Sequence, residues 1–210
     1  MKIEVVSDVI CPWCFLGKRR LDKALTLVPE ISAEVIWRPF FLDPSIPPEG
    51  LSREKYMREK FGNRDLKSMH KPLEDAGAKD GVPYQFDKIA RTPNTLDAHR
   101  LIRWAKQADR QEAVVEALFL AYWRDGKDVG DHKVLVEVAI AAGMDGQEIA
   151  LLLSKDTDKR AVMEEVEKSY QLGVQGVPTF IIDNKYGVSG AQEAEALAAT
   201  LRQVAAKSSI

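Results

Sequence analysis

Two cysteines in the pattern Cys11-Pro12-Trp13-Cys14 are the residues of this 210-residue chain best suited to chemistry, and the chain has no others. Such a pair can open and close as a disulfide: one sulfur attacks a substrate and the other resolves the mixed disulfide. An inert structural disulfide is an alternative, but so short a loop gives little entropic stabilisation. Structural zinc needs four ligands, and the histidines His70, His99 and His132 show no metal-type spacing. Redox exchange without a metal is therefore favoured.

The sequence around the cysteines predicts where they lie. Residues 3–6 (IEVV) are typical of a strand, and a helix is expected from the motif to Pro29. Pro12 suits the first helical position, because its missing N–H would have no partner there. Cys11 is then the N-cap, where unpaired N–H groups and the helix dipole favour an anion. We expect a reactive thiolate at Cys11 and a resolving thiol at Cys14.

Composition excludes several classes of protein. The chain is 45% hydrophobic and 30% charged, which is ordinary for a globular protein. A net charge of -2 gives no reason to expect a nucleic acid or an anionic membrane as partner. No apolar run approaches the ~20 residues that span a bilayer. The chain starts with Met1-Lys2 and no signal segment. Because its two cysteines both lie in the motif, a reducing, cytoplasmic location is expected.

The elements that must position the motif are divided between the two ends of the chain. Residues 33–37 are expected to form a second strand, which completes a β-α-β unit. Strands at 177–182 and 186–188 and a helix at 194–205 form a β-β-α unit. Between them, helical segments are predicted at 52–61, 66–76, 94–105, 114–122, 131–143, 145–153 and 162–170, with 77–93 irregular. The fold class is therefore α/β, with residues 1–50 and 174–210 in one domain and 51–173 as an all-helical insertion.

This order resembles the thioredoxin fold, and with its large insertion it resembles the DsbA-like family of thiol–disulfide oxidoreductases. The match depends on the Cys-Pro-Trp-Cys motif after the first strand, on the insertion, and on residues 176–180 (GVPTF). The resemblance implies that Pro178 is a cis-proline facing the active site and that Val177 presents its backbone to substrate. The alternative for Pro178 is an ordinary proline at the start of a strand.

Three further segments resemble the FrnE-type branch of that family: residues 38–44 (RPFFLDP), 94–100 (NTLDAHR) and 189–192 (SGAQ). That branch is similar to 2-hydroxychromene-2-carboxylate isomerases and kappa-class glutathione transferases. Those relatives have a serine at the place of Cys11 and bind glutathione. They also have a Ser/Asn-Asp pair where this chain has Ala191-Gln192, a departure that weakens the case for glutathione binding.

Four more residues are candidates for the site. Trp13 is expected to offer an aromatic contact to substrate. His99 is expected to exchange protons or to line the groove, with a hydrogen-bonded boundary histidine as the alternative. Asn94 is either an N-cap or a ligand to substrate. Asp8 is either a proton acceptor for Cys14 or, as we favour, a loop residue.

The sequence therefore predicts an enzyme, a dithiol–disulfide oxidoreductase acting on protein or small-molecule thiols and disulfides. It is expected to need no metal and no organic cofactor, with glutathione as an optional co-substrate. A monomer and a homodimer are both compatible with the sequence. A glutathione-dependent isomerase or transferase is the alternative. A third hypothesis is a peptide-binding or chaperone module that uses the groove beside Pro178, with incidental redox chemistry.

Overall fold

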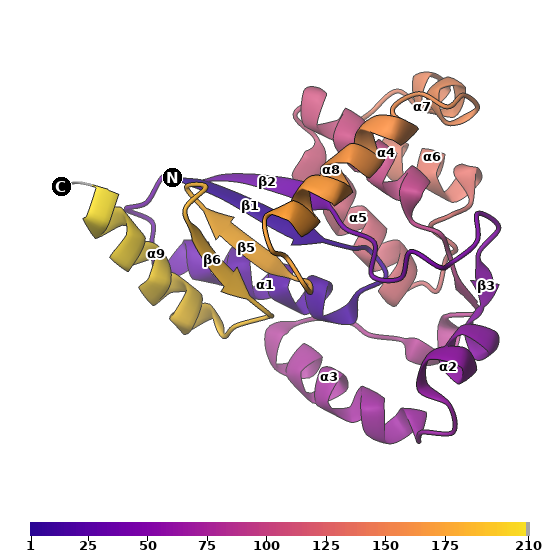
Figure 1. Ribbon diagram of the computed structural model, residues 1–210, viewed down its shortest axis with the longest axis horizontal. Helices are drawn as coiled ribbons and strands as arrows, with labels where there is room; N and C mark the ends of the chain where they lie inside the picture. Colours follow the sequence, from indigo (N-terminus) through magenta and orange to yellow (C-terminus); the bar gives the residue numbers. More distant parts are fainter. Residues whose placement is uncertain (209–210) are drawn as a thin grey trace.

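A mixed sheet of four strands forms the centre of the computed structural model, which describes residues 1–208 (Figure 1). The strand order is β2-β1-β5-β6; β1 is parallel to β2 and antiparallel to β5, and β5 is antiparallel to β6. Their bounds are β1 Lys2–Ser7, β2 Glu34–Pro39, β5 Thr179–Ile182 and β6 Tyr186–Ser189. The prediction of one sheet built from both chain ends is confirmed. β2 continues two residues past its predicted end, because an edge strand tolerates the missing N–H of Pro39.

Helices α1 (Pro12–Leu27) and α9 (Ala194–Ser208) pack against each other and against one face of the sheet. Successive residues of β1 point to opposite faces. Ile3 and Val5 belong to the main core beneath these helices, whereas Val6 belongs to a small second cluster on the other face. The first strand is thus buried on both sides, which gives the residues that follow it, including the cysteines, a rigid support.

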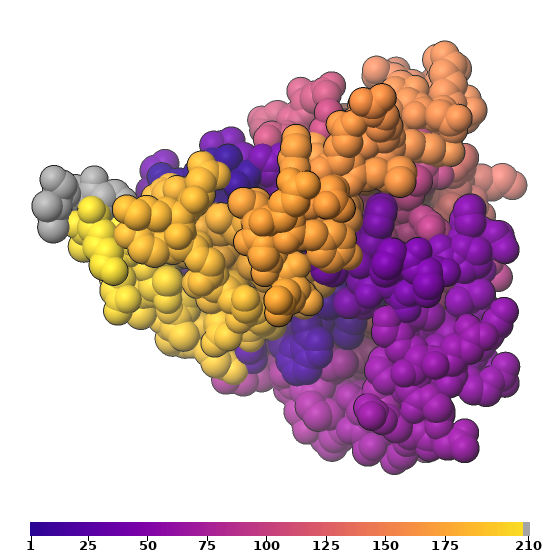
Figure 2. Space-filling view, viewed as in Figure 1, coloured from indigo at the N-terminus to yellow at the C-terminus, as the bar shows by residue number. Residues whose placement is uncertain are grey.

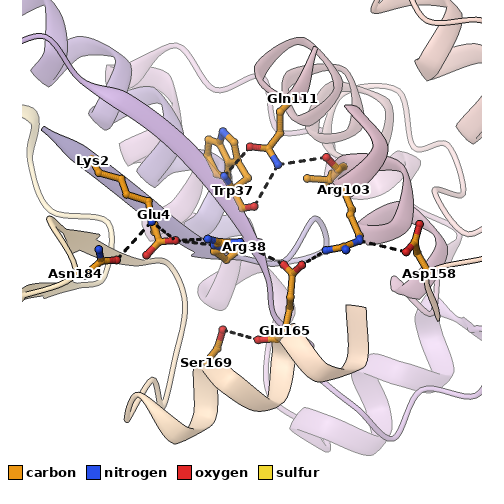
Figure 3. Close-up of polar contacts among 11 residues, drawn as sticks. Lys2, Glu4, Trp37, Arg38, Arg103, Gln111, Asp158, Glu165, Ser169 and Asn184 are labelled. Carbon is orange, nitrogen blue, oxygen red and sulfur yellow. Dashed lines mark hydrogen bonds and ion pairs between the residues drawn. The ribbon is translucent and has the colours of Figure 1, made fainter. Parts of the chain in front are cut away.

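Helix α8 (Lys159–Gln171) lies over the second face and is held there by charge (Figure 3). Glu165 lies between two guanidinium groups: it is 3.6 Å from Arg38 of β2 and hydrogen-bonded to Arg103. Arg38 in turn donates to Glu4 of β1 over 2.8 Å. This row of alternating charges fixes α8 across the strands, so the chain that leaves α8 is directed back toward the start of α1.

The other helices come between β2 and β5 in the sequence. They are α2 Arg53–Phe61, α3 Leu66–Asp80, α4 Leu96–Gln107, α5 Gln111–Trp123, α6 His132–Ala141 and α7 Gly146–Leu153. Several of these helices begin at a capping side chain. Ser52, Asp131 and Asp145 accept hydrogen bonds from first-turn N–H groups. One buried cluster includes residues of both the sheet unit and these helices, among them Val5, Leu118 and Leu197.

The expected thioredoxin-type α/β architecture is confirmed, but the insertion is not entirely helical. A short antiparallel ribbon pairs β3 (Leu51–Ser52) with β4 (Arg91–Thr92), in a region where the sequence shows no strand periodicity. Its pairing brings the segment after α3 back beside the start of α2. The sequence predicted only irregular structure for this returning segment.

Helix α3 also continues four residues past its predicted end at 76. Gly77, the first residue of the segment expected to be irregular, is buried inside the helix. A Cβ at Gly77 would lie 2.7 Å from the ring of Tyr84, so glycine is needed there for close packing. The helix ends before Gly81, whose φ of 73° is the left-handed conformation that favours glycine.

No helix in the part of the chain that the structure describes is long and apolar enough to cross a membrane.

Candidate active site

Cys11 and Cys14 are both free thiols at the start of α1, and Cys11 is the N-cap, as the sequence predicted. The Cys11 backbone is extended, with φ -90° and ψ 114°, and Pro12 is the first helical residue. The Cys11 N–H donates to the Asp8 carbonyl over 3.1 Å, and the Cys11 carbonyl accepts from the Cys14 N–H over 3.1 Å. The motif therefore forms a tight turn that places both thiols at the beginning of the helix.

The two cysteines differ in their surroundings. Burial raises the pKa of the Cys14 thiol well above its ordinary value, and the neighbouring Cys11 raises it further. The Asp8 backbone and the Ser7 hydroxyl favour the Cys14 thiolate, but their effect is smaller. Cys14 is therefore protonated at neutral pH while both thiols are reduced.

The segment before β5 lies against the Cys11 sulfur. The Val177–Pro178 bond is cis, and the Cys11 thiol donates to the Val177 carbonyl over 3.6 Å. Pro178 packs on the active-site helix at Gly17, where a Cβ would lie only 2.8 Å from the proline Cγ. Gly17 is thus part of the site because it has no side chain. Its only signal in the sequence is a glycine within a helical pattern, which is not specific.

Tyr84 is a further site residue that the sequence did not indicate. Its hydroxyl donates to the Pro12 carbonyl over 2.5 Å, inside the cysteine motif. Burial raises the pKa of Tyr84 far above its ordinary value, and the nearby Cys11 and Cys14 raise it further. Its ring stacks on Phe86 with centroids 5.2 Å apart. The segment predicted to be irregular thus brings an aromatic hydroxyl to the cysteines.

Trp13 is the exposed residue of the motif, with 42% of its surface accessible, whereas the two cysteines are at most 2% exposed. Figure 2 shows the indigo N-terminal segment reaching the surface between the orange segment that leads to β5 and the purple region of α2 and α3. Of the two cysteines and Trp13, only the Trp13 side chain is open to contact from solvent.

His99 lies in the interior and is only 3% exposed. Its Nε2 is 3.0 Å from the Phe40 carbonyl and 3.3 Å from Asp8 Oδ1. Asp8, itself 1% exposed, accepts from the Leu42 N–H over 2.7 Å. The structure thus does not place His99 on an open groove; it shows the alternative, a histidine held by hydrogen bonds. Asp8 and His99 together hold the loop after β2 beneath the cysteine turn.

Both polar atoms of the Asn94 side chain form hydrogen bonds within the protein. Its Oδ1 accepts from the Leu96 N–H over 3.0 Å, and its Nδ2 donates to the Ile46 carbonyl over 2.8 Å. The helix itself begins at Leu96, with Thr95 rather than Asn94 as the N-cap. Asn94 therefore supports the start of α4 and joins it to the loop at Ile46.

The Ala191 backbone and the Gln192 side chain also form hydrogen bonds within the protein. The Ala191 carbonyl accepts from Arg20 over 2.6 Å, and the Gln192 side chain donates to the Ser189 carbonyl over 2.8 Å. Arg20 is buried and also pairs with Asp80 over 2.7 Å. This corner is thus closed by internal hydrogen bonds, and Gln192 is turned toward its own strand.

Among residues 1–208 there is no group of three or more His, Cys, Asp or Glu side chains that could hold a metal ion. The two thiols are the chemically reactive groups at the site. The arrangement places two free, buried thiols one helical turn apart at the start of α1, beside the exposed ring of Trp13.

Comparison with known proteins gives a family match over nearly the whole chain. Residues 2–202 match the model described as DSBA-like thioredoxin domain. A crystal structure of a probable DsbA oxidoreductase, SCO1869 from Streptomyces coelicolor, is 34% identical with a TM-score of 0.89, covering 97% of this chain and 89% of that one. The uncharacterized protein YwbO of Bacillus subtilis (strain 168) is 26% identical over 181 residues, 86% of each chain. The cytosolic disulfide reductase DsbM from Pseudomonas aeruginosa, solved with GSH, shares the fold at 17% identity and a TM-score of 0.69, covering 97% of this chain and 98% of that one.

Proposed function

Because the chain belongs to the DSBA-like thioredoxin domain family, we propose that it is a dithiol–disulfide oxidoreductase with Cys11 as nucleophile and Cys14 as resolving thiol. The observation that carries this proposal is the unequal pair at the start of α1. Cys11 caps the helix and faces the Val177 carbonyl, whereas burial keeps Cys14 protonated. The Cys11 sulfur is thus the one that attacks the substrate, and the Cys14 sulfur stays protonated until the mixed disulfide has formed.

The reaction proceeds by two exchanges at sulfur. The Cys11 thiolate attacks one sulfur of a substrate disulfide; a mixed disulfide forms, and the other substrate sulfur leaves as a thiolate and takes a proton from water. Cys14 then loses its proton and attacks the Cys11 sulfur, which releases the second substrate thiol. Two electrons pass from the enzyme dithiol to the substrate disulfide. The reverse sequence oxidises a substrate dithiol.

Substrate is held beside Cys11 by backbone and aromatic contacts. An extended segment pairs with the backbone of Val177, and Pro178 presents no N–H toward it. The exposed ring of Trp13 covers the apolar part of that segment. Asn94 and His99, whose polar atoms are used internally, act by holding the surrounding loops.

The reaction needs neither a metal nor an organic cofactor, because the two sulfurs carry the electrons themselves. Substrates are protein or small-molecule thiols and disulfides, and glutathione serves as a small co-substrate, as the complex of the distant relative DsbM with GSH suggests. We place the protein in the FrnE-type branch and in the cytoplasm, as a monomer or homodimer without nucleic-acid or membrane partners. The paired thiols of a chain with no other cysteines support this location.

Single-cysteine variants test the proposal. Cys14→Ser is expected to lose multiple-turnover disulfide exchange and to accumulate a mixed disulfide at Cys11, whereas Cys11→Ser should form none. A glutathione-dependent isomerase or transferase would instead keep its activity in Cys14→Ser, since it needs no resolving thiol. Peptide binding that persists unchanged without either thiol, together with no exchange activity in the wild type, would favour a binding module.

A further inference from the structure

We propose that Tyr84 is a positioning residue that strengthens the hydrogen bond offered to the Cys11 thiolate, acting through the Pro12–Trp13 peptide group. The inference deepens the proposed function, and it rests on that function only in taking Cys11 as the reactive thiol. Tyr84 comes from the segment between α3 and β4, 72 residues from Pro12 in the sequence. The contact links the inserted region directly to the redox motif.

The hydroxyl of Tyr84 is fixed in place by the packing of its ring. Phe15 and Trp123 meet the ring edge-on, with centroids 6.1 and 5.6 Å away, and Phe86 stacks on it at 5.2 Å. On another side, Gly77 leaves room for the ring, since a Cβ there would be 2.7 Å from it. The ring therefore cannot swing away without disturbing several buried contacts, and the hydroxyl remains 2.5 Å from the Pro12 carbonyl.

The accepting carbonyl belongs to the same amide as the N–H of Trp13. Trp13 is the second residue of α1, and the N–H at that position is one that an N-cap side chain can accept from. Within residues 1–208 this N–H has no acceptor in the dithiol form, and the N-cap side chain is that of Cys11. In the dithiol form the Cys11 side chain makes no capping hydrogen bond and its thiol donates to the Val177 carbonyl instead. Once Cys11 loses its proton, its sulfur can only accept hydrogen bonds, and the N-cap position offers it the Trp13 N–H.

Hydrogen bonds in a chain polarise one another, so a donor on the carbonyl oxygen makes the N–H of the same amide a stronger donor. Tyr84 remains such a donor throughout the working range, because burial raises its pKa far above the ordinary value and it stays protonated. Tyr84 therefore favours the Cys11 thiolate without placing a charge beside it.

The expected size follows from the cooperativity of hydrogen bonds. Strengthening one charge-assisted bond by about 10–30% changes the equilibrium between thiol and thiolate about 1.3- to fivefold. Loss of the hydroxyl should therefore raise the pH at which Cys11 alkylation reaches half its maximal rate by about 0.1–0.7. Because the thiolate stabilises the reduced form, the equilibrium constant with glutathione should move by a similar factor toward the intramolecular disulfide.

The test compares Tyr84→Phe with Tyr122→Phe. Tyr122 is the matched control, because its buried hydroxyl also donates to a backbone carbonyl, that of Arg91, at 3.3 Å, but outside the motif. Rates of alkylation, assigned to Cys11 by peptide mapping, are measured against pH. The expected result is an upward shift in Tyr84→Phe and none in Tyr122→Phe. No shift in Tyr84→Phe, or equal shifts in both variants, would overturn the proposal.

Site-specific 3-fluorotyrosine at position 84 has nearly the same shape as tyrosine and should shift the pH dependence of alkylation in the opposite direction. Its hydroxyl is a stronger donor, so the alkylation midpoint should fall, and a rise or no change contradicts the proposal. This variant decides the question even if Tyr84→Phe does not fold. Alkylation needs no substrate, so the result is independent of whether disulfide exchange is the natural activity.

Discussion

Replacing Gly17 by alanine adds one methyl group at the contact between the active-site helix and Pro178. In an open helix position this change stabilises a protein by about 0.5–1 kcal/mol, because alanine is the better helix former. Here the new Cβ would lie 2.8 Å from Pro178 Cγ and 3.4 Å from Phe180 Cζ. Pro178 is a rigid, buried ring whose carbonyl accepts from the Gly190 N–H over 2.8 Å, so it cannot turn aside as a flexible side chain would.

Overpacking of this kind costs about 1–3 kcal/mol, which outweighs the gain in helix propensity. We expect Gly17→Ala to lower the free energy of unfolding by about 1 kcal/mol. Pro178 must also move away from the helix, and the Val177 carbonyl moves with it relative to Cys11. Since a displacement of ~1 Å at a reacting centre can cost up to ~100-fold in rate, turnover should fall about tenfold or more.

The assays are urea unfolding and multiple-turnover reduction of a disulfide substrate. Gly146→Ala is the matched control: its Cβ would come 2.6 Å from Ile140 Cδ1, but that side chain is 57% exposed and free to rotate. The control should keep full turnover and at least its original stability. If Gly17→Ala were more stable than the wild type and turned over normally, the packing of Pro178 on α1 would not position the site.

Three further predictions concern charge and protonation. Alkylation at pH 7 should label Cys11 well before Cys14. Because burial raises the pKa of Cys14, the rate at which Cys14 is labelled should increase only at pH values above the range in which an ordinary thiol ionises. Equal labelling rates at pH 7 would contradict the assigned roles. Asp80→Ala, which removes a carboxylate from buried Arg20, should lower the free energy of unfolding by about 2–3 kcal/mol in urea titrations, whereas Arg160→Ala at the exposed pair with Glu164 should change it by less than about 0.5 kcal/mol. Burial raises the pKa of Tyr122 to about 12. The stabilisation of the fold by the protonated Tyr122 is therefore complete below pH 10 and is lost as the pH rises to 12. Over that interval the free energy of unfolding should fall by about 2–3 kcal/mol more in the wild type than in Tyr122→Phe, and equal losses would refute this.

Local rules were sufficient to place the cysteines. Pro12 and the strand before it predict that Cys11 caps a helix, because each signal concerns neighbours along the chain. The assembly of one sheet from both ends also followed from the order of strand-like and helix-like segments. These features depend on backbone periodicity and capping, which a single sequence carries.

Contacts between distant residues could not be obtained in this way. Tyr84 reaches Pro12, and Gly17 receives Pro178, only because the tertiary fold brings them together. The sequence predicts that residues 77–93 are irregular, whereas α3 continues through Gly77, where packing against Tyr84 requires a glycine. His99 lies beside the apolar stripe of its helix, and the loop after β2 then covers it. In each case tertiary packing overrode the local signal.

A glutathione redox titration of the Cys11–Cys14 pair, read by mass spectrometry after acid quenching and alkylation, tests the central claim most directly. The account predicts one reversible two-electron transition in which both thiols disappear together and a Cys11–Cys14 disulfide forms without lasting glutathione adduct. A titration that ends with glutathione on Cys11 and a free thiol at Cys14 would contradict it, because Cys14 would then not act as the resolving thiol.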